Sequence, residues 1–259
     1  MDARVDVARR VLGLIDLTDL GERTTAEAIA EICRRAVGPH GSTAAVCVWP
    51  EFVARAADAL RGSGVTVATV VNFPDGADDE VPVVRQIREV LAAGADEVDL
   101  VLPYRSYLAG RPRVAAAMID AAREEVPSDK LLKVILETGS YPNQRDVAGA
   151  AALAIEHGAD FIKTSTGKTA VSATPDAVRT MLEEIRRSAR RVGLKPSGGI
   201  RTVDDAARYL ALADEVMGED WATRDTFRFG VSGLLDVVEA TIAGPSIADA
   251  GVDGNGFHY

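Results

Sequence analysis

Two lysines stand within short apolar segments of the sequence, a position that lysine rarely occupies. Lys163 lies in FIKTSTGK, residues 161–168, and Lys195 lies in LKPSGG, residues 194–199. Lysine is seldom buried and has a low propensity for strands, so both placements need an explanation. Each could be a structural lysine that pairs with a carboxylate or reaches water with its long stem. The alternative is covalent chemistry, because a neutral lysine amine attacks a carbonyl and forms a Schiff base.

The presence of two such lysines, with Asp99 in a further apolar segment, favours the chemical interpretation. A lysine with an ordinary pKa of ~10.4 is neutral in only about one molecule in 2,500 at pH 7. Burial and a neighbouring cation both disfavour the ammonium form and therefore lower that pKa. We expect one lysine to be a nucleophile and the other to lower its pKa, although these residues alone do not say which is which.

The segments that carry these residues belong to a regular alternation of short apolar runs with longer runs of helical period. Several of the short runs are apolar on both faces, as expected for buried parallel strands. Strict alternation fits a (β/α)8 TIM barrel, although an open doubly wound sheet would give a similar pattern. No GxGxxG follows the first run, which favours the barrel. The predicted strands span residues 14–18, 44–49, 65–71, 97–102, 132–137, 160–164, 192–196 and 228–231.

Helix start and stop signals support the same α/β organisation. Thr24 and Thr202 each precede an acidic residue by three positions, which is capping-box spacing, and Thr174 precedes a proline at the first helical position. Gly94 and Gly158 each end a helical run and are followed by Ala-Asp and a predicted strand, as repeated units require. We predict a single barrel domain over residues 1–243 and a flexible, glycine-rich C-terminal tail over residues 244–259.

Polar residues at the carboxyl ends of the predicted strands mark the expected site, because a TIM barrel places its chemistry there. Besides the two lysines, Asp16, Asp99 and Glu137 occupy such positions. Turns rich in glycine and hydroxyl groups follow the last three strands, and their backbone amides suit a phosphate. A glycine pair alone usually marks a turn, but loops after strands seven and eight are the usual phosphate site of these barrels. The candidate phosphate-binding residues are Gly167, Lys168, Gly198, Gly199, Ser232 and Gly233.

Composition excludes several other classes of protein. The formal net charge is −10 and the pI is near 4.9, so the surface as a whole would repel nucleic acid and anionic membranes. Cys33 and Cys47 both fall in apolar segments and predict neither a disulfide nor a metal site, and the three histidines are too scattered to bind zinc. No apolar run is long enough for a signal peptide or a membrane helix. We expect a cytoplasmic protein without a metal.

The chain resembles the class I, Schiff-base deoxyribose-phosphate aldolases over nearly its whole length. The resemblance rests on LIDLTDL, TAAVCVWP, EVDLVLPYRSYLAG, VILETG, FIKTSTGK, KPSGGIRT and FRFGVSGLL, of which FIKTSTGK together with KPSGG is the most specific. It implies reversible cleavage of 2-deoxy-D-ribose 5-phosphate to acetaldehyde and D-glyceraldehyde 3-phosphate in deoxynucleoside catabolism, with no metal or organic cofactor. It also implies a homodimer or a larger homo-oligomer.

The resemblance assigns roles that the residues alone leave open. It implies that Lys163 forms the Schiff base, that Lys195 depresses its pKa and takes part in proton transfer, and that Asp99 handles protons with a bound water. Asp16 and Lys168 match family positions that line the site. Members of one subgroup end in a tyrosine that reaches the active site, which makes the final residue a further catalytic candidate, Tyr259.

Two alternatives remain open at this stage. Another lysine aldolase would differ only in its donor, because donor choice depends on the size of the pocket beside the nucleophile. A barrel that binds a sugar phosphate without cleaving it would need neither lysine, so the intact set of Lys163, Lys195 and Asp99 argues against it. Members of the family often carry two serines where this chain has Ser232 and Gly233, and we expect only a modest effect on phosphate affinity.

Overall fold

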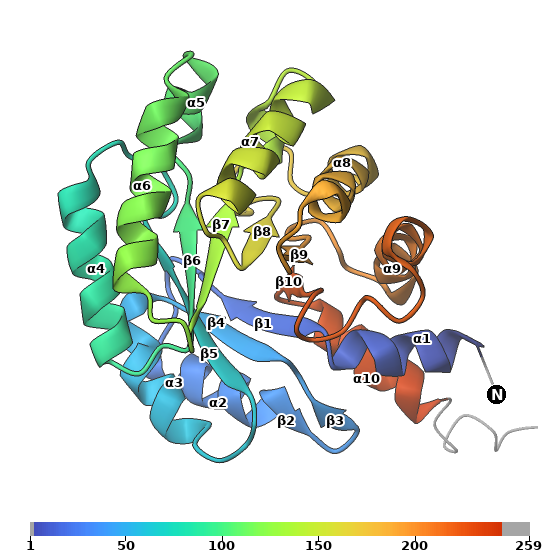
Figure 1. Ribbon diagram of the computed structural model, residues 1–259. Helices are drawn as coiled ribbons and strands as arrows, with labels where there is room; N and C mark the ends of the chain where they lie inside the picture. The colour runs from blue at the N-terminus through green and yellow to red at the C-terminus, as the bar shows by residue number, and fades with distance from the viewer. Residues whose placement is uncertain (1–2, 245–259) are drawn as a thin grey trace, which may run out of the picture.

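All eight predicted strands are present in the computed structural model, which describes residues 3–244. They run parallel and lie at the centre of the molecule with the helices outside them (Figure 1). Their spatial order is β10-β1-β4-β5-β6-β7-β8-β9. The strands are β1 (Ile15–Asp19), β4 (Ala45–Val48), β5 (Thr66–Val71), β6 (Glu97–Val101), β7 (Leu131–Ile135), β8 (Phe161–Lys163), β9 (Gly193–Lys195) and β10 (Phe229–Val231).

The two ends of this sheet meet between β9 and β10. Leu194 N donates to Thr226 O at 2.8 Å, Arg228 N donates to Leu194 O at 3.0 Å, and Gly230 N donates to Pro196 O at 2.9 Å. Parallel bridges join the same segments. The sheet is therefore closed, which confirms the (β/α)8 barrel and excludes the open doubly wound sheet.

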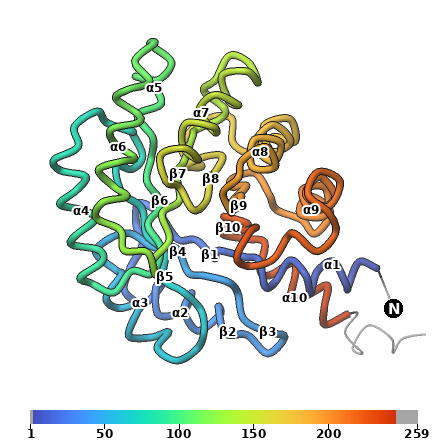
Figure 2. The backbone as a smooth tube through the Cα atoms, viewed as in Figure 1, coloured from blue at the N-terminus to red at the C-terminus, as the bar shows by residue number. Residues whose placement is uncertain are grey.

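Eight helices follow the eight strands in turn. α1 (Ala3–Leu12) precedes the first strand and packs beside the last helix (Figure 2). A short helix, α5 (Tyr104–Leu108), and a small hairpin of β2 (Val37–Gly38) and β3 (Gly41–Ser42) are additions to the pattern. No helix within residues 3–244 combines the length and apolarity needed to cross a membrane. The eight are α2 (Ala26–Ala36), α3 (Val53–Ala59), α4 (Glu80–Ala92), α6 (Pro112–Glu125), α7 (Gln144–Glu156), α8 (Pro175–Arg187), α9 (Val203–Met217) and α10 (Leu234–Ala243).

The helix caps agree with the sequence prediction in two cases of three. Thr174 caps α8, and Thr202 forms a reciprocal capping box with Asp205 at the start of α9. The prediction for Thr24 was wrong, because Thr25 is the residue that caps α2. Thr24 instead donates its hydroxyl to Asp19 Oδ1 at 2.6 Å and closes the turn that leaves β1.

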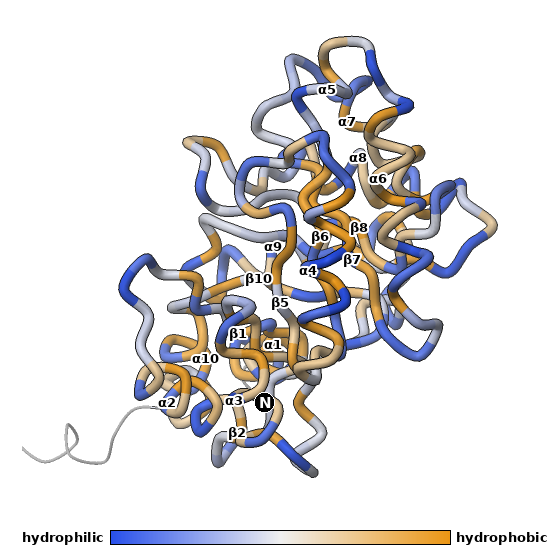
Figure 3. Tube along the Cα trace, turned by 90° about the vertical axis from the view of Figure 1, so that its left-hand side faces the viewer, coloured by the Kyte–Doolittle hydropathy of each residue, from blue (hydrophilic) through white to orange (hydrophobic). Residues whose placement is uncertain are grey.

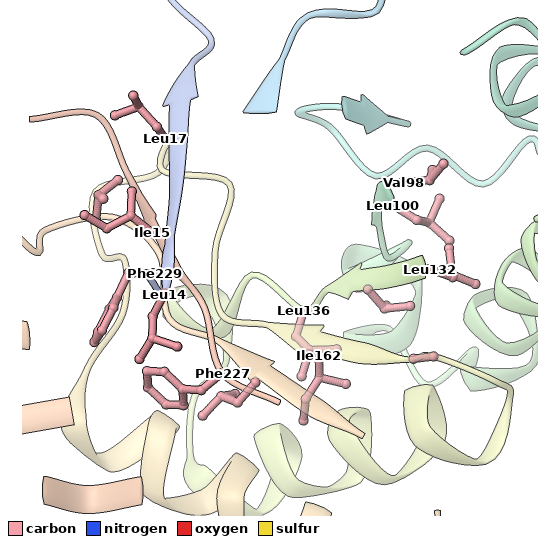
Figure 4. Close-up of a cluster of buried hydrophobic side chains, with 14 of the residues drawn as sticks. Leu14, Ile15, Leu17, Val98, Leu100, Leu132, Leu136, Ile162, Phe227 and Phe229 are labelled. Carbon is pink, nitrogen blue, oxygen red and sulfur yellow. The ribbon is translucent and has the colours of Figure 1, made fainter. Parts of the chain in front are cut away.

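Alternation along each strand separates the apolar core from the barrel interior. Leucines, valines and phenylalanines of the strands form the layer beneath the helices (Figure 4), and the central strands are accordingly among the most apolar parts of the chain (Figure 3). The intervening residues point into the barrel, where Asp16, Lys133 and Lys195 are fully buried. The strands β1, β7 and β9 are therefore not among those that are apolar on both faces. Their inner faces carry charge.

A glycine opposite an aromatic ring makes the interior packing possible. Gly193 on β9 pairs with Phe161 on β8, and a Cβ added at Gly193 would lie 2.3 Å from the Phe161 ring. Phe161 is itself buried, at 1% exposure. The missing side chain at position 193 therefore provides the space that the ring fills.

We expect Gly193→Ala to destabilise the protein by about 2 kcal/mol, the usual cost of overpacking a close-packed core. Urea unfolding followed by circular dichroism measures this change. Gly13→Ala is the matched control, because an added Cβ there meets nothing within 4 Å, and its stability should stay within about 0.5 kcal/mol of the parent. Equal stability of the two variants would contradict the packing argument.

Candidate active site

A network of charged side chains fills the barrel interior among the residues that the structure describes. Each of its members is at most 3% exposed. They come from six neighbouring positions around the barrel, from β6 through β10 to β1. Buried charges of this kind must be paired, because an isolated charge is strongly disfavoured away from water. The members are the cations Lys133, Lys163, Lys195 and Arg228 and the carboxylates Asp16, Glu97 and Asp99.

Asp99 is the carboxylate that joins the three lysines. Its Oδ2 accepts hydrogen bonds from Lys163 Nζ and Lys195 Nζ, both at 2.8 Å, and its Oδ1 accepts one from Lys133 Nζ at 2.8 Å. Burial alone would raise the pKa of Asp99, but the three ammonium groups, Lys133 foremost, hold it well below its usual range. Asp99 is therefore a carboxylate at neutral pH.

Lys195 has a second carboxylate partner and stays protonated. Its Nζ lies 2.6 Å from Asp16 Oδ2 as well as 2.8 Å from Asp99 Oδ2. Burial by itself lowers the pKa of Lys195, yet attraction to Asp16 and Asp99 outweighs it and raises the pKa above the ordinary lysine value. Lys195 therefore supplies a fixed positive charge beside Lys163, with which it pairs in register across β8 and β9.

Lys163 is the lysine whose pKa falls. Among the described residues, Asp99 alone brings a carboxylate oxygen within 4 Å of its Nζ. Burial is the main cause of the lowered pKa, the Lys195 cation adds to it, and the attraction of Asp99 opposes it without reversing the direction. The neutral amine needed for attack on a carbonyl is thus more accessible at Lys163 than at Lys195.

Three members of the network were missed in the sequence. Lys133 Nζ lies 2.5 Å from Glu97 Oε2, and Arg228 bridges Glu97 at 3.0 Å and Asp16 at 2.6 Å. Glu97 begins β6, Lys133 is the middle residue of β7 and Arg228 precedes β10, so none of the three lies at the carboxyl end of a strand, where the site was predicted. The signal was present as alternation, since Glu97 and Asp99 share one face of β6 and Lys133 is flanked by apolar residues in β7.

A cavity of about 640 Å³ opens at the carboxyl ends of the strands and reaches Lys163. Its lining includes every residue predicted to bind phosphate, namely Gly167, Lys168, Gly198, Gly199, Ser232 and Gly233. Arg201 also lines it and was not among the predicted residues. A larger hollow of about 740 Å³ beside Trp49 and Phe73 contains none of the lysines. The chemistry and the predicted phosphate site therefore share the first cavity.

Backbone amides make one wall of this cavity suited to an anion. Gly198 and Gly199 both adopt left-handed φ values, 81° and 80°, which a side chain would disfavour. α10 begins directly after Gly233, so its amino end, which carries the positive end of the helix dipole, also faces this loop region. Lys168 adds a cation, although its Nζ donates to Leu20 O at 2.8 Å in this structure.

Glu137 holds the loop that carries Gly167 and Lys168. It is fully buried at the end of β7 with a left-handed φ of 61°, an unfavourable backbone for a residue with a side chain. Its carboxylate accepts hydrogen bonds from the hydroxyls of Thr166 at 2.5 Å and Thr169 at 3.1 Å. The strained backbone therefore directs a carboxylate at the loop that follows β8.

The interior on the side of β4 and β5 is apolar and lined by small residues. Leu20, Ala45, Cys47, Ala68 and Val70 form a separate buried cluster there. Cys47 forms no disulfide, and burial raises the pKa of its thiol. The barrel interior thus has a charged part, from β6 through β10 to β1, and a smaller apolar part on β4 and β5. The last predicted catalytic residue, Tyr259, lies outside the described residues.

The fold and the site together define a (β/α)8 barrel in which a buried lysine of lowered pKa lies at the base of a cavity lined by glycine-rich loops. The family model of DeoC/LacD family aldolases matches residues 10–239. The chain therefore belongs to this family, and the protein is an aldolase, an enzyme that makes and breaks carbon–carbon bonds.

Individual relatives agree with this assignment. The chain is 48% identical over 246 residues, 95% of each sequence, to a curated deoxyribose-phosphate aldolase of Agrobacterium fabrum. A crystal structure from Toxoplasma gondii, provisionally named a deoxyribose-phosphate aldolase, has a TM-score of 0.85 at 26% identity and covers 94% of this chain and 98% of its own. The deoxyribose phosphate aldolase of Aeropyrum pernix, described as a tetramer, has a TM-score of 0.72 at 25% identity and covers 92% of both chains.

We expect Asp16→Asn to destabilise the protein by about 3 kcal/mol at pH 7, because it leaves Lys195 and Arg228 short of a buried partner. The pKa of Asp16 is lowered below its usual 3.8, since the surrounding cations outweigh burial, so its contribution is present above that value and is lost as the pH falls below it. Denaturant unfolding at pH 7 and pH 3 should show the difference shrinking in acid.

The control for this prediction is Asp58→Asn, which breaks an exposed pair with Arg61 and should change stability by less than about 0.5 kcal/mol at either pH. A gap between Asp16→Asn and the parent that stays constant from pH 7 to pH 3 would show that the Asp16 charge is not what stabilises the network.

Proposed function

We propose that the protein is a class I deoxyribose-phosphate aldolase in which Lys163 forms the Schiff base. The observation that carries the proposal is the position of Lys163. Among the described residues it shares its one carboxylate partner with Lys195, which is protonated at neutral pH, and it opens into the cavity of glycine amides. The reaction is the reversible cleavage of 2-deoxy-D-ribose 5-phosphate to acetaldehyde and D-glyceraldehyde 3-phosphate. The name of the Agrobacterium fabrum relative supports this choice of substrate.

In the cleavage direction, neutral Lys163 attacks C1 of the open-chain aldehyde and forms a carbinolamine, which loses water to become an iminium ion. A base then removes the proton of the C3 hydroxyl, the C2–C3 bond breaks, and its electron pair moves into the iminium as an enamine. Glyceraldehyde 3-phosphate leaves. Protonation of the enamine at C2 and hydrolysis then release acetaldehyde and restore the amine.

The neighbouring residues have separate roles in this scheme. Lys195 disfavours the ammonium form of Lys163 and donates protons, while Asp99, together with a bound water, accepts and returns them. Asp16 holds Lys195. Lys168 and the amides of Gly198 and Gly199 bind the phosphate, and Tyr259 is a further proton-transfer candidate. The small residues on β4 and β5 suit a two-carbon donor beside Lys163.

We also propose that the enzyme acts in the cytoplasm as a homodimer or larger homo-oligomer. Two buried cysteines that form no disulfide fit a reducing compartment. The tetramer described for the Aeropyrum pernix relative supports self-association. Light scattering coupled to size-exclusion chromatography tests the oligomeric state directly.

Trapping of the intermediate tests the nucleophile. Incubation with acetaldehyde and reduction by borohydride should add one ethyl group to Lys163, located by peptide mass spectrometry. Lys163→Ala should abolish the adduct and reduce kcat/KM on the order of 10⁴-fold or more. An adduct that persists in Lys163→Ala would overturn the proposal, and turnover of a dihydroxyacetone donor in place of acetaldehyde would favour a different lysine aldolase.

Removal of the Lys195 cation should make the pH dependence of adduct formation on Lys163 differ from that of the parent enzyme. Lys195→Leu takes away a charge that lowers the pKa of Lys163, so the neutral fraction of Lys163 at pH 7 should fall about 100-fold if that pKa rises by two units. Adduct formation with acetaldehyde should recover in part as the pH is raised toward 10. An unchanged pH profile would show that Lys195 does not control the nucleophile.

Comparison of phosphorylated and unphosphorylated substrates tests the anion site. Lys168→Met should reduce kcat/KM for 2-deoxyribose 5-phosphate roughly 10- to 100-fold, about 1.4 to 2.8 kcal/mol, and change that for 2-deoxyribose little. Lys130→Met is the control, because Lys130 pairs with Asp96 at the opposite end of the barrel and should affect neither substrate. Equal losses for both substrates would place Lys168 outside the phosphate site.

A further inference from the structure

The barrel interior holds more buried cations than carboxylates. Within the described residues, four cations, Lys133, Lys163, Lys195 and Arg228, face three carboxylates, those of Asp16, Glu97 and Asp99. With every group ionised, the network would carry one excess positive charge. An uncompensated buried charge is costly, so the network favours the loss of one proton.

The distances show which cation is left over. Lys133 lies 2.5 Å from Glu97 and 2.8 Å from Asp99, and Arg228 lies 2.6 Å from Asp16 and 3.0 Å from Glu97. Lys195 also contacts two carboxylates. Lys163 contacts one oxygen, Asp99 Oδ2, and shares it with Lys195. Of the four, Lys163 therefore gains least from its own positive charge.

Lys133 limits what Asp99 can offer to Lys163. It occupies Asp99 Oδ1 with its own hydrogen bond, so that both other lysines depend on Oδ2. Glu97 anchors Lys133 from the other side, and Arg228 and Thr66 hold Glu97 in place. Glu97, held by Arg228 and Thr66 away from the cavity, therefore fixes the position of Lys133 and stabilises its positive charge.

We propose that Lys133 is a positioning residue that, through the charge balance of the buried network, sets the pH at which Lys163 becomes a neutral nucleophile. This inference rests on the proposed role of Lys163 as the Schiff-base lysine. Lys133 does not line the cavity, so its effect passes through Asp99. Glu97 has the opposite effect, because removing its charge increases the excess of cations.

The other groups that face Lys163 do not take over the proposed effect of Lys133 on its protonation. Asp99 approaches from β6 and Lys195 from β9, while β7 presents the apolar Ile135 in register with Lys163. Asp16 from β1 acts on Lys195. Cys47 approaches from β4 as a thiol whose pKa is raised by burial, so it contributes no charge at neutral pH. Lys133 and Glu97 can therefore be altered without replacing a residue that contacts Lys163, although Lys133 itself contacts Asp99.

The pH dependence of adduct formation tests the proposal. The full-length protein is incubated with acetaldehyde and cyanoborohydride between pH 5 and pH 10, and the rate of ethyl addition to Lys163 is followed by mass spectrometry. Lys133→Met should move the midpoint upward by about one to two pH units, the effect of one charge several ångströms away at an effective dielectric constant of ~20. Glu97→Gln should move it downward by about one unit.

The double variant Lys133→Met/Glu97→Gln restores the original difference of one charge, and its midpoint should return close to that of the parent. Lys133→Arg keeps the charge and should also stay within about half a unit. The same holds for Lys130→Met, which removes a lysine from the half-buried pair with Asp96 at the opposite end of the barrel. A purely structural role would reduce the amount of active protein without moving these midpoints in opposite directions.

The outcomes separate this inference from the proposed function. If the parent forms no adduct on Lys163, the proposed function fails. If the parent forms the adduct and neither Lys133→Met nor Glu97→Gln moves the midpoint, or both move it the same way, only the charge-balance inference fails. Should Lys133→Met not fold, the downward shift of Glu97→Gln, or its absence, still decides the question.

Discussion

Burial of ionised side chains inside a closed sheet is the constraint on which the site depends. A barrel of eight parallel strands leaves no room for bulk water between them, so each inward-pointing charge must find its partner on a neighbouring strand. The register of β6 with β7 and of β8 with β9 supplies those partners. Asp99 is central because it uses both oxygens, one toward the amino end of the network and one toward the cavity. The protonation of Lys163 thus depends on the buried groups around it.

Much of the fold could be predicted from the sequence because it depends on local patterns. All eight strands fall within a residue or two of their expected positions, and the caps at Thr174 and Thr202 follow from short-range hydrogen bonds. Thr24 and Thr25 are both able to cap α2, and the choice depends on how Asp19 closes the preceding turn, which is a tertiary detail. The pairing of β1 with β10 joins the first and last thirds of the chain, and the contacts between β9 and β10 complete the barrel. This closure was inferred only by counting strands.

The site was predictable in part, because Lys163 and Lys195 end their strands, whereas Asp16 and Asp99 lie within β1 and β6. Lys163, Lys195, Asp99 and Asp16 do lie together, and the glycines expected to bind phosphate line the cavity above them. Lys133 and Arg228 were not predicted, because the sequence alone does not show which residue pairs with a charge in the middle or at the start of a strand. Their partners, Glu97 and Asp16, come from strands distant in sequence, and only the closed barrel makes the pairs visible.

The interior is divided into a charged part, from β6 through β10 to β1, and an apolar part on β4 and β5, and the two parts tolerate substitution differently. Replacing one charged residue leaves its buried partner unpaired, so a change there needs a compensating change at the partner. The part lined by Ala45, Cys47, Ala68 and Val70 contains no such pairs, and each of its residues can change in size by a single substitution. Changes in the shape of the interior are therefore expected along β4 and β5, while the charged residues on the other strands stay in place.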